Sequence, residues 1–107
     1  MLFRSPGCVD LLLTPTTPYP ALDAGQVLGT SLATAVLRAV PMASYTGIWN
    51  VLGNPALSLP WGFTDDGLPL GVQLVGPRDS EALLLAVAAD LEPDRPDAHR
   101  VPALCES

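Results

Sequence analysis

The strongest constraint on the fold is an Asp66-Gly67 pair that lies between two apolar runs, residues 56–63 and 70–75. This dipeptide is typical of a turn between antiparallel strands, so the segment predicts a β-hairpin. In both runs bulky residues alternate with small ones, which predicts one large and one small face. Pro60 has no N–H to donate to a neighbouring strand, and it predicts a sheet margin or an irregularity.

Upstream of the hairpin, the sequence predicts a strand, a proline-rich loop and a helix. Residues 9–14 form a short apolar run closed by Pro15, which is typical of a strand buried on both faces. Apolar residues at helical spacing then predict a helix with Thr30 or Ser31 as its N-cap and an end at Pro41.

Two further helices are predicted. Bulky residues recur at helical spacing over residues 44–52, and Gly53 provides the stop. The last helix follows the hairpin, with Asp79 as its N-cap and an end near Leu91. Residues 82–89 within it, ALLLAVAA, are apolar on every side, which is typical of a helix sandwiched between two layers. Together the elements predict an α/β fold.

Composition limits the partners that this chain can have. Of its 107 residues 49% are hydrophobic and 15% charged, which is enough apolar material for a core. The net charge of -6 would repel phosphate backbones and anionic lipid, so we expect neither nucleic acid nor membrane as a partner. No apolar run approaches the roughly 20 residues that span a bilayer, and the first one breaks too early for a secretory signal. We therefore expect a cytoplasmic protein. Cys8 and Cys105 stand alone, which favours two reduced thiols and no metal site or cofactor.

The sequence contains no recognisable catalytic arrangement. His99 is the single histidine, and it lies in a Pro-rich polar tail, residues 93–107, where we expect it to be solvated. No nucleophile elbow, phosphate-binding loop or zinc-binding helix motif occurs. Asp65 and Asp66 fit a turn better than a pair of catalytic carboxylates. We therefore predict no catalytic residue and no metal ligand in this chain.

Three segments nevertheless resemble, in order, the C-terminal part of the amidase signature family. They are DLLLTPTTPYPA (residues 10–21), YTGIWNVLGNPALSLPWGF (45–63) and GLPLGVQLVGPRDSEALLLAVAADLE (67–92). Members of that family hydrolyse amides, or transfer the released ammonia, on a mixed α/β sheet wrapped by helices. The resemblance implies that residues 1–92 are the C-terminal portion of an amidase domain (strand, helices, hairpin, helix) and that residues 93–107 are a tail.

The resemblance also implies which catalytic groups the chain lacks. The family triad consists of a nucleophilic Ser, a bridging cis-Ser and a Lys base. In the family, the Lys and the Gly/Ser-rich signature lie N-terminal of the segments matched here, and this chain contains no Lys. By this resemblance the chain lacks the Ser-Ser-Lys triad and is inactive alone.

The resemblance further implies a substrate-binding role for Ala43 and Gly47. The matching helix of family members lies along the pocket for a small-molecule amide, and these two positions would face it one turn apart. Glutamine-using amidotransferases tend to carry an acid at the position of Ala43, so alanine favours a general amidase with an uncharged pocket. Close helix packing explains the two small residues equally well. Thr16 and Thr17 are candidates to face the same cleft, although a turn and surface role is favoured for them.

Three functional hypotheses follow. The chain is a fragment of a linear-amide hydrolase, arising from a truncated, split or mis-started gene. Alternatively, it is a non-catalytic module that binds a partner or small ligand near Gly47. In the third hypothesis it complements a separately encoded N-terminal amidase portion. The helix that is apolar on every side disfavours the second hypothesis, because little else in the chain could cover both of its sides.

Overall fold

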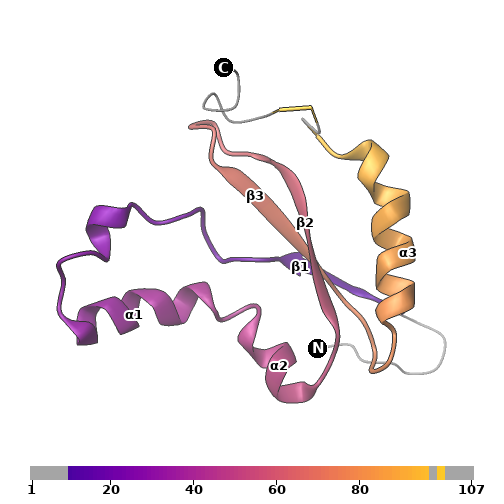
Figure 1. Cartoon of the computed structure of the whole chain (residues 1–107), viewed down its shortest axis with the longest axis horizontal. Coiled ribbons are helices and arrows are strands. Elements are labelled where there is room, and N and C mark those ends of the chain that lie inside the picture. The colour runs from indigo at the N-terminus through magenta and orange to yellow at the C-terminus, as the bar shows by residue number, and fades with distance from the viewer. Residues whose placement is uncertain (1–9, 97–98, 101–107) are drawn as a thin grey trace.

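The computed structural model describes residues 10–96, 99 and 100, and these form helices around a three-stranded sheet (Figure 1). The strands are β1 (Leu12–Pro15), β2 (Ala56–Phe63) and β3 (Pro69–Val75). The helices are α1 (Leu32–Met42), α2 (Gly47–Leu52) and α3 (Glu81–Leu91), with short 3-10 helices at Ala24–Gln26 and Glu92–Asp94. The strands pair antiparallel in the order β1-β3-β2. The α/β prediction is confirmed.

β2 and β3 form the predicted hairpin. The Thr64 N–H donates to the Leu68 carbonyl at 2.9 Å, and the Gly67 N–H donates to the Thr64 carbonyl at 2.9 Å. Gly67 has a φ of 84°, which glycine adopts without steric strain. The register of the two strands shifts between Pro60 and Phe63. The predicted irregularity at Pro60 is therefore confirmed.

The large face of the hairpin carries the core. Leu59 and Leu74 from the strands pack against Leu84 and Ala88 from α3, and all four are buried. Five partly buried residues complete this cluster: Leu11, Leu57, Val72, Val87 and Leu91. The predicted division of the hairpin into a large and a small face is confirmed, because the buried leucines alternate with the smaller residues along both strands.

β1 is more exposed than its sequence predicts. It pairs only with β3, at one edge of the sheet, and exposure alternates along it so that Leu13 is exposed. The prediction of a strand buried on both faces is therefore wrong for the described part of the chain. A continuous apolar run suits two covering layers, and the residues that the structure describes do not provide them. Val9, the first residue of the predicted strand, lies outside the described residues.

Two helix termini differ from the predictions. α1 begins as predicted, with the Ser31 hydroxyl accepting from the Thr34 N–H at 3.3 Å, but it continues one residue beyond Pro41. A proline in the last turn removes only one helical hydrogen bond, so the helix tolerates it there. The N-cap of α3 is Ser80 and not Asp79. Asp79 has a φ of 62°, in the left-handed region, which differs from the extended backbone typical of an N-cap.

α2 is shorter than predicted, and Gly53 ends it in the left-handed conformation, with a φ of 69°. A Cβ at Gly53 would meet no atom closer than 3.8 Å, so only the backbone penalty would oppose a side chain. We expect Gly53→Ala to lower the free energy of unfolding by about 1 kcal/mol. Gly47→Ala is the matched control, because a Cβ there meets nothing within 4 Å and Gly47 is not in the left-handed region. Urea unfolding of both variants measures the difference, and an equal loss in both would contradict this explanation.

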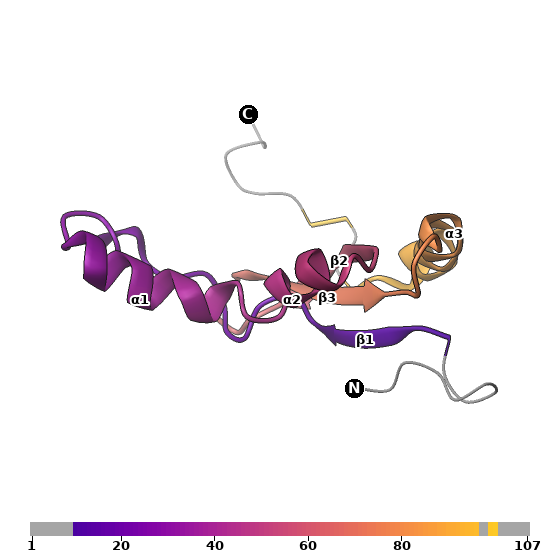
Figure 2. The same ribbon diagram turned by 90° about the horizontal axis from the view of Figure 1, so that it is seen from below.

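The described elements spread into a flat body, with α1 and α3 at opposite ends of the sheet (Figure 2). The radius of gyration is 16.5 Å, and the extents are 49 × 39 × 20 Å. A compact chain of this length has a radius of gyration of about 13 Å. α1 contains no buried residue. Large apolar side chains are exposed on α1 (Leu32, Val36, Leu37, Val40) and on the outer side of α3 (Leu83, Leu85). Within the described chain, α3 is covered on one side only, so the predicted sandwich is incomplete.

Candidate functional site

The small face of the sheet carries a row of polar side chains. Thr14 on β1 and Ser58 on β2 are both register partners of Gln73 on the central strand β3. The Thr16 Oγ1 lies 2.8 Å from the Ser58 Oγ. A Cβ at Gly71 would lie 3.0 Å from the Thr16 hydroxyl oxygen and 3.2 Å from that of Ser58. Glycine at this position therefore makes room for the hydroxyl pair.

Gln73 is buried in the middle of this row, with 3% of its surface exposed. Its Nε2 donates to the Thr14 Oγ1 at 3.1 Å and to the Tyr45 carbonyl oxygen at 2.9 Å. A carbonyl oxygen can only accept, so this contact settles which end of the amide is the nitrogen. The two hydrogen bonds connect β3 to β1 and to the turn between α1 and α2.

A cavity of about 400 Å³ opens above the hydroxyl pair. Its walls include Thr16 and Thr17 from the loop after β1, Met42 from the end of α1, and Ser58 and Gly71 from the sheet. We call this space the hydroxyl cavity. Among the described residues no charged side chain lines it, so its chemistry suits a neutral ligand that can exchange hydrogen bonds with hydroxyl groups.

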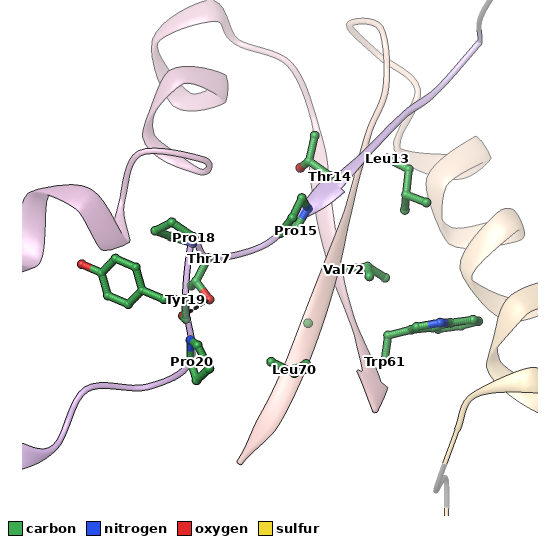
Figure 3. Close-up of a pocket in the computed structure, with 11 residues that line it drawn as sticks. Leu13, Thr14, Pro15, Thr17, Pro18, Tyr19, Pro20, Trp61, Leu70 and Val72 are labelled. Atoms are coloured by element: carbon green, nitrogen blue, oxygen red, sulfur yellow. Dashed lines mark hydrogen bonds between the residues drawn. The ribbon is translucent and has the colours of Figure 1, made fainter. Parts of the chain in front are cut away.

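A second cavity, of about 490 Å³, lies beside the same loop (Figure 3). Figure 3 shows Tyr19 and the loop prolines on one side of it and Trp61 on the other, with Leu70 and Val72 between them. We call it the apolar cavity. Its walls are mostly apolar, so they would favour a hydrocarbon group of a ligand or an apolar segment of a partner.

Ala43 and Gly47, the predicted substrate-binding residues, lie at the turn between α1 and α2. The Gly47 N–H donates to the Ala43 carbonyl at 2.8 Å, so the two are one helical turn apart as expected. Ala43 is exposed, and space is open beside Gly47. Neither residue lines the hydroxyl cavity, but Met42, which does, directly precedes Ala43. Their substrate-binding role stays a prediction.

The structure places other residues in the cavities more directly. Thr16 and Thr17, the less favoured candidates, both lie on the wall of the hydroxyl cavity. Ser58 and Trp61, which line the cavities, and Gln73, which does not, were not predicted to contribute to the site. A usable signal existed for Gln73, because it is the one polar residue in an otherwise apolar strand, LPLGVQLV. Ser58 hydrogen-bonds to Thr16, 42 positions away, and Trp61 lines the apolar cavity together with loop residues; the sequence gives no local sign of either.

The remaining polar candidates lie on the surface of the described part of the chain. His99 is exposed, and so are Asp65 and Asp66 at the hairpin tip. Among the described residues, no three His, Cys, Asp or Glu side chains gather closely enough to hold a metal ion. In the same part of the chain no helix has the length and apolar character needed to cross a membrane. Cys8 and Cys105 lie outside the described residues.

Comparison with known proteins decides the family. The model of the Amidase family matches residues 1–85. This chain belongs to the amidase family. AmiB2 of Mycobacterium tuberculosis, a protein named as an amidase, is 41% identical over 96 residues, covering 90% of this chain and 21% of that protein. A glutamyl-tRNA(Gln) amidotransferase chain from a Synechococcus species is 45% identical over 102 residues, covering 88% of this chain and 19% of that relative.

The fold of the amidase chain also matches a solved structure. The structure of a 6-aminohexanoate cyclic dimer hydrolase superposes with a TM-score of 0.78 at 39% identity, covering 89% of this chain and 21% of that one. This chain therefore spans about a fifth of the length of the relatives that it matches. It corresponds to part of an amidase domain. The predicted family is confirmed.

Proposed function

We propose that this chain forms a substrate-facing part of an amidase and works only with the rest of the amidase domain. The observation that carries the proposal is the apolar surface of α1 and the outer side of α3, which no described residue covers. Contiguous apolar surfaces of this kind normally mark an interface. The remaining four fifths of a relative's length could supply the protein surface that covers these apolar side chains.

The chemistry of the chain supports the same division of labour. By resemblance to the amidase signature family, hydrolysis requires a Lys base, and this chain contains no Lys. The hydroxyl groups of Thr16 and Ser58 hydrogen-bond to each other, and the single His is exposed near the C-terminus. In this proposal residues 1–92 contribute to the amidase domain, residues 93–107 are a tail, and the triad comes from the other portion in the cytoplasm.

The proposed substrate is an uncharged linear amide. Ala43 and Gly47 would contact it together with the hydroxyl cavity, whose described lining residues are all uncharged. A carboxylate or ammonium group on the substrate would find no partner of opposite charge among these residues. The matched relatives include both a cyclic dimer hydrolase and an amidotransferase, so the preference for a general amidase rests on the lining of this cavity.

Co-production tests the proposal. The chain is produced alone, and also together with an N-terminal amidase portion that carries the Ser-Ser-Lys triad, and ammonia release from aliphatic amides is measured. We expect no hydrolysis by the chain alone and turnover by the complex, which Lys→Ala in the N-terminal portion abolishes. Hydrolysis by the chain alone, or a soluble complex without turnover, would overturn the proposal.

A non-catalytic binding module is the second candidate, and the apolar cavity is the observation that favours it. A module of this kind would bind a small apolar ligand without any second polypeptide. Calorimetric titration of the isolated chain with short aliphatic amides distinguishes the two candidates. Saturable binding by the chain alone supports the module, whereas binding that requires the N-terminal portion supports the amidase proposal.

A further inference from the structure

Gln73 connects the two walls of the hydroxyl cavity. One wall is the loop after β1, with Thr16, and the other is the end of α1, with Met42. The hydrogen bonds from Gln73 reach Thr14, two residues before Thr16, and Tyr45, three residues after Met42. One buried side chain on the central strand therefore hydrogen-bonds to the segments that carry both walls.

The turn between α1 and α2 receives a hydrogen bond from the sheet through Gln73. Its backbone hydrogen bonds, such as those from Thr46 and Gly47 to the Ala43 carbonyl, stay within the turn and shape it without attaching it to the sheet. α1 itself contains no buried residue and makes no extensive contact with a strand. Loss of the Gln73 amide would also remove this donor from the Tyr45 carbonyl, in a hydrogen bond that is partly shielded from solvent.

We infer that Gln73 is a positioning residue for substrate selection, which sets the width of the hydroxyl cavity. It holds the turn that carries Ala43 and Gly47 at a fixed distance from the threonine loop. Gln73 does not line the cavity, and both of its amide hydrogens are directed at protein acceptors. It therefore acts through the walls and not by touching the substrate. The inference rests on the proposed function, because a selected substrate requires an amidase.

The first test uses the 107-residue chain without any partner, and its readout does not depend on activity. Gln73→Met keeps the length of the side chain but removes both donors. We expect hydrogen exchange at the Thr46 and Gly47 amides to accelerate about 10-fold, the effect of losing one hydrogen bond. Exchange in the hairpin should stay unchanged. Gln26→Met is the matched control, because Gln26 is exposed in a short 3-10 helix. Unchanged exchange at the turn, or equal acceleration by both substitutions, overturns the inference.

The second test measures hydrolysis by the complex of the chain with the N-terminal amidase portion. We expect Gln73→Met to raise KM for a short aliphatic amide about 10-fold while kcat changes less than about 3-fold, because a displaced wall weakens binding without altering the triad. Thr14→Val removes the hydrogen bond between Gln73 and Thr14 and leaves the one to the Tyr45 carbonyl in place. It should therefore raise KM by a smaller factor than Gln73→Met. The two changes together should raise KM by less than the product of the single effects. A fall in kcat with KM unchanged overturns the inference.

The two tests separate failure of the inference from failure of the proposed function. If the wild-type complex hydrolyses no amide, the proposed function fails and Gln73 loses its role in selection, while the exchange experiment still decides whether Gln73 holds the turn. If the wild-type complex is active and Gln73→Met has the KM and kcat of Gln26→Met, only the inference fails.

Discussion

Leu84→Ala is expected to lower the free energy of unfolding by about 3 kcal/mol. Leu84 is 2% exposed and packs from α3 against Leu59 and Leu74 of the hairpin. Truncating a leucine at such a site removes its transfer free energy and leaves a cavity, which together cost about 2–5 kcal/mol. The effect should be large here because the described core is small. It contains six buried apolar residues: Trp49, Leu59, Leu74, Val75, Leu84 and Ala88.

Leu85→Ala is the matched control for this prediction. Leu85 is the next residue of the same helix and is 62% exposed, so its truncation should change the free energy of unfolding of the isolated chain by less than about 0.5 kcal/mol. Urea unfolding followed by far-ultraviolet circular dichroism measures both variants. Equal losses would mean that α3 does not pack on the hairpin through the side that carries Leu84.

Leu37→Asp is expected to weaken assembly with the N-terminal amidase portion by at least about 100-fold, equivalent to ~3 kcal/mol. Leu37 is 74% exposed on the bare apolar side of α1, so an aspartate there stays solvated in the isolated chain and costs little. In the complex the same carboxylate would be buried in an apolar interface without a cation, which is strongly unfavourable. The change should therefore affect assembly and leave the stability of the chain alone nearly unaltered.

Arg38→Asp places a carboxylate on the opposite side of the same helix, where Arg38 is exposed. Affinity for the N-terminal portion, measured by calorimetry, and the restored ammonia release should both fall with Leu37→Asp and stay near the wild-type values with Arg38→Asp. Wild-type affinity in the Leu37→Asp variant would show that α1 does not form the interface.

The hairpin was predictable from the sequence because its signals are local. The Asp66-Gly67 pair, the alternation of large and small residues, and Pro60 each act through neighbouring residues, and the structure confirms all three. The N-cap of α1 at Ser31 is equally local. The predicted N-cap of α3 was wrong because Asp79 has a left-handed backbone, which no local pattern of the sequence indicates.

The candidate site was less predictable because it depends on contacts between distant segments. The hydrogen bond from Gln73 to Thr14 joins residues 59 positions apart, and the bond between Thr16 and Ser58 spans 42 positions. The helical and strand periodicities of a sequence do not indicate which distant residues form such pairs. The predicted burial of β1 was wrong for a related reason, because an apolar run shows that a strand needs covering layers but not whether the same chain supplies them.

Residue-resolved hydrogen exchange of α1, with and without the N-terminal amidase portion, tests the central claim most directly. In the isolated chain we expect the amides of β3 to be protected, while those of α1, which buries no residue, exchange almost as fast as in an unfolded peptide. Addition of the N-terminal portion should protect α1 to the level of β3. Protection of α1 equal to that of β3 in the chain alone would contradict the account, because α1 would then be stable without the N-terminal portion.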